Sequence, residues 1–290
     1  MKLDEIIRFL SEPVQEGKVS TSDKVKAFIT RDFKIWWTYK LWVTLDILGS
    51  LTFVATYYFV SKIVTTQALM DSGYIADYLT FAVIGIAFQH YVFSSVSSLS
   101  EAIREEQWAG TMETILASKT SFGTFLLGES VFRFIIGSYF LLASLGMGFA
   151  IGARFNVTAP SLLSAALVAL LLIASHMVVG ILGAGAILKL KQGDPIVWAF
   201  SWLTQLFSGV LYPLGLLPSY LQWVGAAFPL TYSLDGLRRC LMNGEDLSSA
   251  VIFADVTMLT LFVVVMLPLS LWVFRKAYDS TRREGALGQY

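Results

Sequence analysis

The residues able to take part in chemistry are ionisable side chains that interrupt the long apolar stretches of this 290-residue chain. Such a group inside a membrane-spanning helix is a candidate for function, because burying its charge in lipid is costly. The candidates are Asp46, Glu129, Arg133 and His176. Glu129 and Arg133 are four residues apart and share a helix face. They are expected either to pair with each other, which eases insertion, or to contact a substrate.

Motifs for catalysis and metal binding do not occur in the sequence. No HExxH or GxSxG pattern is found, and the two histidines, His90 and His176, are far apart. Cys240 is the only cysteine, so neither an internal disulfide nor a cysteine-rich metal cluster is expected. The sequence therefore predicts that the chain is not an enzyme and holds no cofactor or metal of its own.

The composition indicates the class of protein that must position these groups. Hydrophobic residues make up 56% of the chain and charged residues only 14%, whereas soluble domains carry about 25% charged residues. The formal net charge is zero, which argues against a nucleic-acid-binding protein, because such proteins carry a basic footprint. We expect an all-α polytopic membrane protein.

Six stretches are apolar and long enough to cross a hydrocarbon core, which takes about 20 residues per helix. They are residues 41–64, 78–100, 122–152, 159–188, 196–217 and 250–274. With the N-terminus inside, 16 of the 21 basic residues fall on the cytoplasmic side. The positive-inside rule then places both termini in the cytoplasm. The expected organisation is a cytoplasmic segment over 1–40, a six-helix transmembrane domain over 41–274 and a basic cytoplasmic tail over 275–290.

The segment 22–40 shows helical periodicity with basic residues on the opposite face. This pattern predicts an amphipathic helix in the plane of the cytoplasmic interface, capped by Ser22 or Asp23 and leading into the first span like an elbow. The aromatic residues expected to form its apolar face are Phe28, Phe33, Trp36 and Trp37. A simple juxtamembrane anchor is the alternative.

Two connections carry further signals. The cytoplasmic connection 101–130 is acidic at its start, and apolar residues such as Ile103, Trp108 and Met112 suit a short, half-buried helix there. An acidic amphipathic helix suits docking of a protein partner, and a solvated linker helix is the alternative. The outer connection 211–246 is apolar, but Pro213, Pro218 and Pro229 exclude one continuous helix. It predicts two short re-entrant helices that end near Asn243–Gly244 and close an external opening, or else a flat cap on the outer surface.

These connections, in this order among six spans, resemble the permease subunit of type-2 ABC exporters. The coupling region of that family has a Glu-rich stretch followed by Gly-Thr-(Leu/Met)-Glu, which here reads Glu105-Glu106-Gln107-Trp108-Ala109-Gly110-Thr111-Met112-Glu113. The outer loop of the family has motifs that match Tyr212-Pro213, Leu217-Pro218, Pro229-Leu230-Thr231-Tyr232 and an arginine, either Arg238 or Arg239. The resemblance covers roughly residues 23–275.

The resemblance implies a permease of the cell membrane, in a prokaryote, that works as a homodimer with separate ATP-binding subunits. ATP and Mg would be bound by those subunits, and no phosphate-loop motif occurs in this chain. The implied ATPase interface is a coupling helix over 101–117 with Glu101, Arg104, Glu105, Glu106, Trp108, Gly110, Thr111 and Glu113. The implied external gate comprises Tyr212, Pro213, Pro218, Pro229, Thr231, Tyr232 and Arg238.

The substrate class follows less directly. Spans 1 and 5 are rich in aromatic residues such as Tyr57, Trp198 and Trp202, and in the family these spans form much of the dimer interface and the pathway. A hydrophobic, lipidic or glycan substrate is expected, next to membrane lipid itself. An ion-gradient-driven secondary transporter is the alternative, although the sequence shows no internal repeat. An integral-membrane enzyme is a more remote one.

Overall fold

The computed structural model describes residues 19–64, 67–75, 77–118, 120–190 and 195–283. Within these ranges the chain forms helices and no strand, which confirms the all-helical prediction for this part. Residues 1–18 of the predicted N-terminal segment and 284–290 of the predicted tail lie outside the described residues. The side chain of Glu113 does too.

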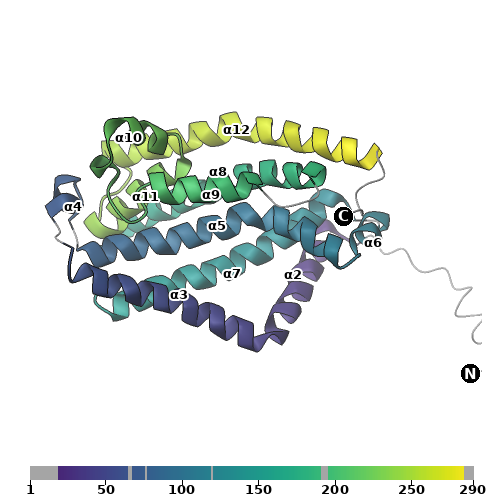
Figure 1. Ribbon diagram of the computed structural model, residues 1–290, viewed down its shortest axis with the longest axis horizontal. Helices are drawn as coiled ribbons and strands as arrows, with labels where there is room; N and C mark the ends of the chain where they lie inside the picture. The colour runs from purple at the N-terminus through teal and green to yellow at the C-terminus, as the bar shows by residue number, and fades with distance from the viewer. Residues whose placement is uncertain (1–18, 65–66, 76, 119, 191–194, 284–290) are drawn as a thin grey trace, which may run out of the picture.

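Five helices in the described part are long and apolar enough to cross a membrane. They are α3 (Lys40–Ser61), α5 (Tyr78–Trp108), α7 (Phe122–Ala150), α8 (Ala159–Leu190) and α12 (Ala250–Arg283). They correspond to five of the six predicted spans. Figure 1 shows these helices running side by side along the long axis of the molecule.

The bounds predicted for the fifth span, 196–217, are wrong. Its helix, α9 (Pro195–Phe207), has 13 residues, or about 20 Å at 1.5 Å per residue. A turn follows, in which Gly209 takes a positive φ of 71°. Three short elements come next: η1 (Leu214–Leu216), α10 (Ser219–Ala226) and α11 (Pro229–Arg238). Hydropathy alone did not reveal the turn, because the residues around Gly209 remain apolar.

The N-terminal helix α2 (Thr21–Thr38) confirms the predicted helix. Its cap is Ser20 rather than Ser22 or Asp23, because Ser20 and Asp23 form a reciprocal capping box. The helix ends at Thr38, Tyr39 is its C-cap, and α3 starts at Lys40. Figure 1 shows α2 at an angle to α3, as expected of an elbow.

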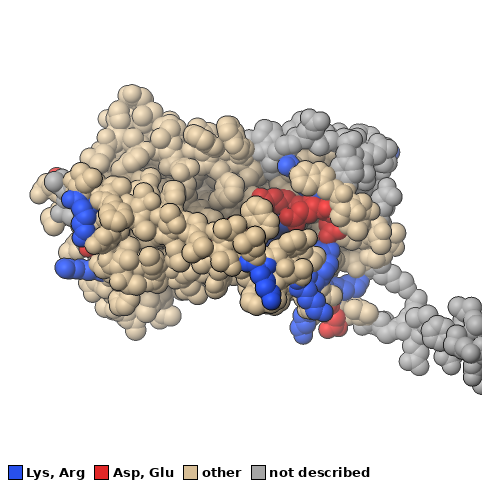
Figure 2. Space-filling model, turned by 60° about the horizontal axis from the view of Figure 1, so that its bottom comes forward, with Lys and Arg blue, Asp and Glu red and all other residues tan. Residues whose placement is uncertain are grey.

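The bundle is centred on α5, which packs against α7 and α8, while α8 also packs against α12. In Figure 1, α2 and α6 (Met112–Ala117) lie toward one end, and α4 (Gln67–Asp71), α10 and α11 lie at the other. On the face in Figure 2, charged side chains gather toward the two ends and uncharged ones cover the band between them. This distribution is what a bundle that crosses a membrane requires.

Candidate transport cavity and the charged clusters at its ends

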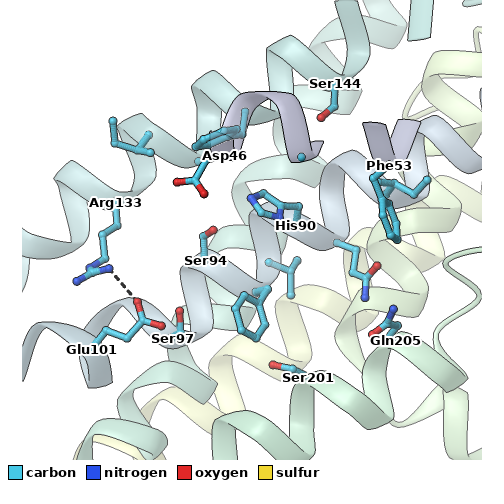
Figure 3. Close-up of a pocket in the computed structure, with 18 of the residues that line it drawn as sticks. Asp46, Phe53, His90, Ser94, Ser97, Glu101, Arg133, Ser144, Ser201 and Gln205 are labelled. Carbon is cyan, nitrogen blue, oxygen red and sulfur yellow. Dashed lines mark hydrogen bonds and ion pairs between the residues drawn. The ribbon is translucent and has the colours of Figure 1, made fainter. Parts of the chain in front are cut away.

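A cavity of about 840 Å³ lies among α3, α5, α7 and α9. Seven aromatic rings line it, including Trp36, Phe53, Trp198 and Trp202, and so do hydroxyl and amide side chains. In Figure 3, Asp46 on α3 and His90 and Ser94 on α5 point toward the same space, with Ser201 and Gln205 on the α9 side. The cavity therefore combines an apolar wall with a few polar groups, as ligand pockets do.

Several predicted residues meet in this cavity and others do not. Asp46, Trp198 and Trp202 line it, next to Ser94 and Ser97 of α5. His176 does not line it. Its ring is fully buried, and Nδ1 lies 2.7 Å from the carbonyl oxygen of Leu172. His176 is thus a buried polar residue of the bundle.

At one end of the bundle, Arg31 of α2 contacts three carboxylates. Its Nη1 lies 2.6 Å from Glu106 Oε1, its Nε donates to Asp32 Oδ1 at 2.8 Å, and its Nη2 donates to Glu129. The three acidic residues are buried. We call Arg31, Asp32, Glu106 and Glu129 the elbow cluster, because it connects α2 with α5 and α7.

The electrostatics of the elbow cluster follow from burial and from charge pairing. Burial opposes the charge on Arg31, but the hydrogen bond to Asp32 and the charges of Glu129 and Glu106 raise its pKa above its ordinary value. Burial raises the pKa of Asp32, and Arg31 opposes that rise. The guanidinium thus remains charged, while burial favours the protonated form of Asp32.

The predicted pair between Glu129 and Arg133 does not form, because both residues have partners on other helices. Glu129 contacts Arg31. Arg133 donates to Glu101 and Glu105 of α5, each at 2.8 Å. The four-residue spacing would allow Glu129 and Arg133 to pair, but Arg133 pairs with the two carboxylates of the neighbouring helix α5 instead.

The coupling segment 101–117 is not one helix. Residues Glu101 to Trp108 form the last two turns of α5, and α6 has only six residues. Gly110 makes the turn between them with a φ of 68°, a conformation that suits glycine. Ile103 and Met112 fix the two pieces to the bundle, since both are buried in one apolar cluster.

Within this segment, the predicted interface residues divide into exposed and buried ones. Trp108 is 74% exposed, and Glu105, Gly110 and Thr111 are also exposed. Arg104 is half-buried, with its guanidinium 5.9 Å from the ring centre of Trp108. Glu106, in contrast, is buried in the elbow cluster and accepts a hydrogen bond from Thr111. Its carboxylate therefore holds the turn and is not available to a partner.

At the opposite end, Arg238 is fully buried and binds backbone oxygens. Its Nη1 donates to Gly209 O at 2.7 Å, and its Nη2 donates to Val210 O at 2.5 Å and to Phe81 O at 3.1 Å. The guanidinium also lies 3.4 Å from the ring centre of Phe81. Burial lowers the pKa of Arg238 to about 10, which leaves it charged at neutral pH. Arg238 thus anchors the turn after α9 to α5.

The other predicted gate residues form hydrogen bonds within the connection 211–246 and to the end of α9. Thr231 Oγ1 donates to Gly225 O at 2.6 Å, and Tyr232 donates to Ala226 O at 2.8 Å. Tyr212 donates to Leu206 O. Each of the three prolines stands just before a short helix or at its first residue; these are Pro213, Pro218 and Pro229. Two short helices, α10 and α11, are present here, and α11 is followed by a π-helical turn over Arg239–Asn243 and by Gly244. That these helices re-enter the membrane stays a prediction.

Sequence reasoning missed an acidic pair beside this segment. Asp235 of α11 accepts from Tyr74 Oη at 2.6 Å and from Arg239 Nε at 3.0 Å. Asp255 of α12 is buried next to it and interacts with it. Asp255 lies inside the sixth predicted span, so the rule that flagged Asp46 would also have flagged Asp255.

The apolar helices of the described part define a multi-pass membrane protein, and the cavity lies among them. The family model described as ABC-2 family transporter protein matches residues 63–272, which is more than half of the chain. The chain therefore belongs to the ABC-2 transporter family, whose members are membrane components of transporters. No curated protein matches the chain.

Proposed function

We propose that this chain is the permease subunit of an ATP-driven exporter in the cell membrane, with its pathway along the α3–α5–α7–α9 cavity. Separate ATPase subunits would dock on the exposed turn between α5 and α6 and supply the energy. Family membership supports the transporter role, and the absence of a phosphate-loop motif from the sequence supports a motor in another chain.

One observation carries this proposal: α5 is a single helix that both lines the cavity and ends at the exposed turn. Its residues from Ile86 to Glu101 line the cavity, and Trp108 is its last residue. A 31-residue helix is about 46 Å long and stiff along its axis. A displacement of the Trp108 end would therefore shift the cavity wall directly.

The remaining parts of the pathway are proposed from the same contacts. α9 packs against α8 and α10, so α9 together with the turn held by Arg238 would complete a sixth crossing, with α10 and α11 re-entrant. α3 and α9 expose large apolar side chains beside the cavity, such as Trp42, Trp198 and Trp202. A second copy of the chain facing this side would enclose the pathway, as in a homodimer.

The test uses the tagged full-length chain, purified with its ATPase in mild detergent. We expect Trp108→Ala to weaken retention of the ATPase about tenfold, because exposed tryptophans are frequent interface anchors. The wild-type complex should contain two copies of the chain by light scattering. The matched control is Trp223→Ala, since Trp223 is 79% exposed on α10 at the opposite end.

Two outcomes would contradict the proposal. One is equal loss of the ATPase in the Trp108 and Trp223 variants. The other is transport by the purified chain in vesicles when only an ion gradient is present, which would indicate a secondary transporter. A single copy in the complex would contradict the homodimer alone.

A further inference from the structure

The charges around the cavity do not balance. Arg133 is the only Lys or Arg among the described lining residues, and Glu101 and Glu105 already pair with it. Asp46 faces the cavity from α3, and no hydrogen bond or ion pair holds its carboxylate within the described part of the chain. His90 lines the α5 wall and faces Asp46 (Figure 3), yet it is likewise not bonded to it. The cavity thus presents a carboxylate without a counter-ion.

The Asp46 side chain is exposed and borders the cavity. Asp46 is the seventh residue of α3, about 9 Å along the axis from the start of the helix. A charge at the edge of a hydrocarbon core is costly unless it is paired or faces a water-filled cavity. Because Asp46 borders the cavity, its carboxylate can stay charged there and is accessible to a ligand.

The walls around Asp46 suit one kind of counter-ion. Trp36 and Phe53 line the same cavity, and Trp198 and Trp202 line it from α9. Aromatic faces attract cations through their ring quadrupoles, tryptophan most strongly. The rings also accept apolar groups, and a volume of about 840 Å³ holds a ligand of drug size.

From the charge imbalance and the aromatic walls, we infer that the cavity binds an amphipathic organic cation, with Asp46 as its counter-ion. The cationic group sits against the Asp46 carboxylate, and the apolar part of the ligand packs on the tryptophan and phenylalanine rings. This inference assigns a substrate class to the cavity and rests on the proposed function only for the step of transport. Binding itself requires no ATPase.

The experiment measures binding of tetraphenylphosphonium to the full-length chain in detergent micelles by equilibrium dialysis. Triphenylphosphine oxide, a neutral compound with similar aromatic groups, is the companion probe. We expect the wild type to prefer the cation and Asp46→Asn to weaken its binding about tenfold, since one charge pair at a partly screened distance is lost. Asp46→Glu should retain binding of the cation. Asp279→Asn, which changes an exposed carboxylate on α12 outside this cavity, should leave it unchanged.

Three outcomes would overturn the inference: equal binding of the cation and the neutral probe to the wild type, unchanged cation binding in Asp46→Asn, or an equal loss in Asp279→Asn. The comparison of probes on the wild type needs no variant, so it decides the matter even if Asp46→Asn fails to fold. Failure of this test leaves ATPase retention unaffected. Conversely, a chain that binds the cation through Asp46 but recruits no ATPase would contradict only the proposed function.

Discussion

Arg31 and Arg238 lie toward opposite ends of the helix bundle and stabilise it in different ways. Arg31 is partly exposed and pairs with three carboxylates on α2, α5 and α7. Arg238 is fully buried, and its hydrogen bonds to Gly209, Val210 and Phe81 all go to backbone oxygens. Carboxylates can take up protons near neutral pH, whereas backbone carbonyl oxygens do not. We therefore expect the end of the bundle near the α5–α6 turn to be adaptable, because its ion pairs can change with protonation. We expect the end with α10 and α11 to be rigid.

The largest effect should come from removing the rigid anchor. Arg238→Ala leaves three buried carbonyl oxygens without their donor and a cavity in place of the guanidinium. We expect a loss of about 3–5 kcal/mol in the free energy of unfolding, measured by SDS titration of the detergent-solubilised protein. Arg239→Ala is the control, because its side chain is partly exposed and pairs with Asp235. An equal effect of both changes would remove the distinction between anchor and surface arginine.

A second prediction concerns the space around the rigid anchor. A Cβ atom at Gly85 would collide with the carbonyl oxygen of Val210 and would lie 2.5 Å from Arg238 Nη2. Gly85→Ala should therefore destabilise the protein by about 1–3 kcal/mol. Gly146→Ala is the matched control on α7, where a Cβ meets nothing within 4 Å. There the change should be neutral or stabilising by up to about 1 kcal/mol. The same unfolding titration measures both, and a stable Gly85→Ala variant would show that the outer end is not rigid.

The smallest effect is expected at the adaptable end. Arg31→Met leaves Asp32, Glu106 and Glu129 without their cation, but these groups can take up protons. We expect a loss of about 1–2 kcal/mol at pH 8, after allowance for the partial exposure of Arg31.

The pH dependence of that loss follows from Asp32. Burial raises the pKa of Asp32, so protonation favours the folded state and stability falls as the pH rises through that raised pKa. Without Arg31 the pKa of Asp32 should rise further. The loss in the free energy of unfolding caused by Arg31→Met should therefore be smaller at pH 5 than at pH 8. Lys34→Met, an exposed residue one turn further along α2, should show no such dependence. If Arg31→Met lowers the free energy of unfolding by the same amount at both pH values, the end of the bundle near the α5–α6 turn is not adaptable.

Local features of the sequence predicted much of the fold. The spacing of apolar residues located α2, and the three prolines of the outer connection located its short helices. Hydropathy could not show that α9 ends at Phe207 or that α5 continues to Trp108. The end of α9 depends on a turn that Arg238 holds by hydrogen bonds to Gly209 O and Val210 O, which are 29 and 28 positions away in the chain. The continuation of α5 depends on burial of Ile103 against other helices.

The functional residues were predicted less completely than the elements. Asp46, Trp198 and Trp202 were recognised by type, and the structure brings them to one cavity. Glu106 was assigned to a partner surface because it stands in an acidic motif, yet it is buried against Arg31. A motif shows which residues are present, but it does not show which way each side chain of a helix points.

The sequence by itself determined the class of this protein, the order of its helices and the family to which it belongs, because hydropathy, periodicity and motif order are properties of neighbouring residues. Only the tertiary structure decided which acid each arginine contacts and which polar groups share a cavity. Arg31 contacts Glu129, which is 98 positions away in the chain. Arg133 pairs with Glu101 and Glu105 of α5 and not with Glu129 on its own helix. Such pairings depend on the register between packed helices, which short-range patterns do not specify.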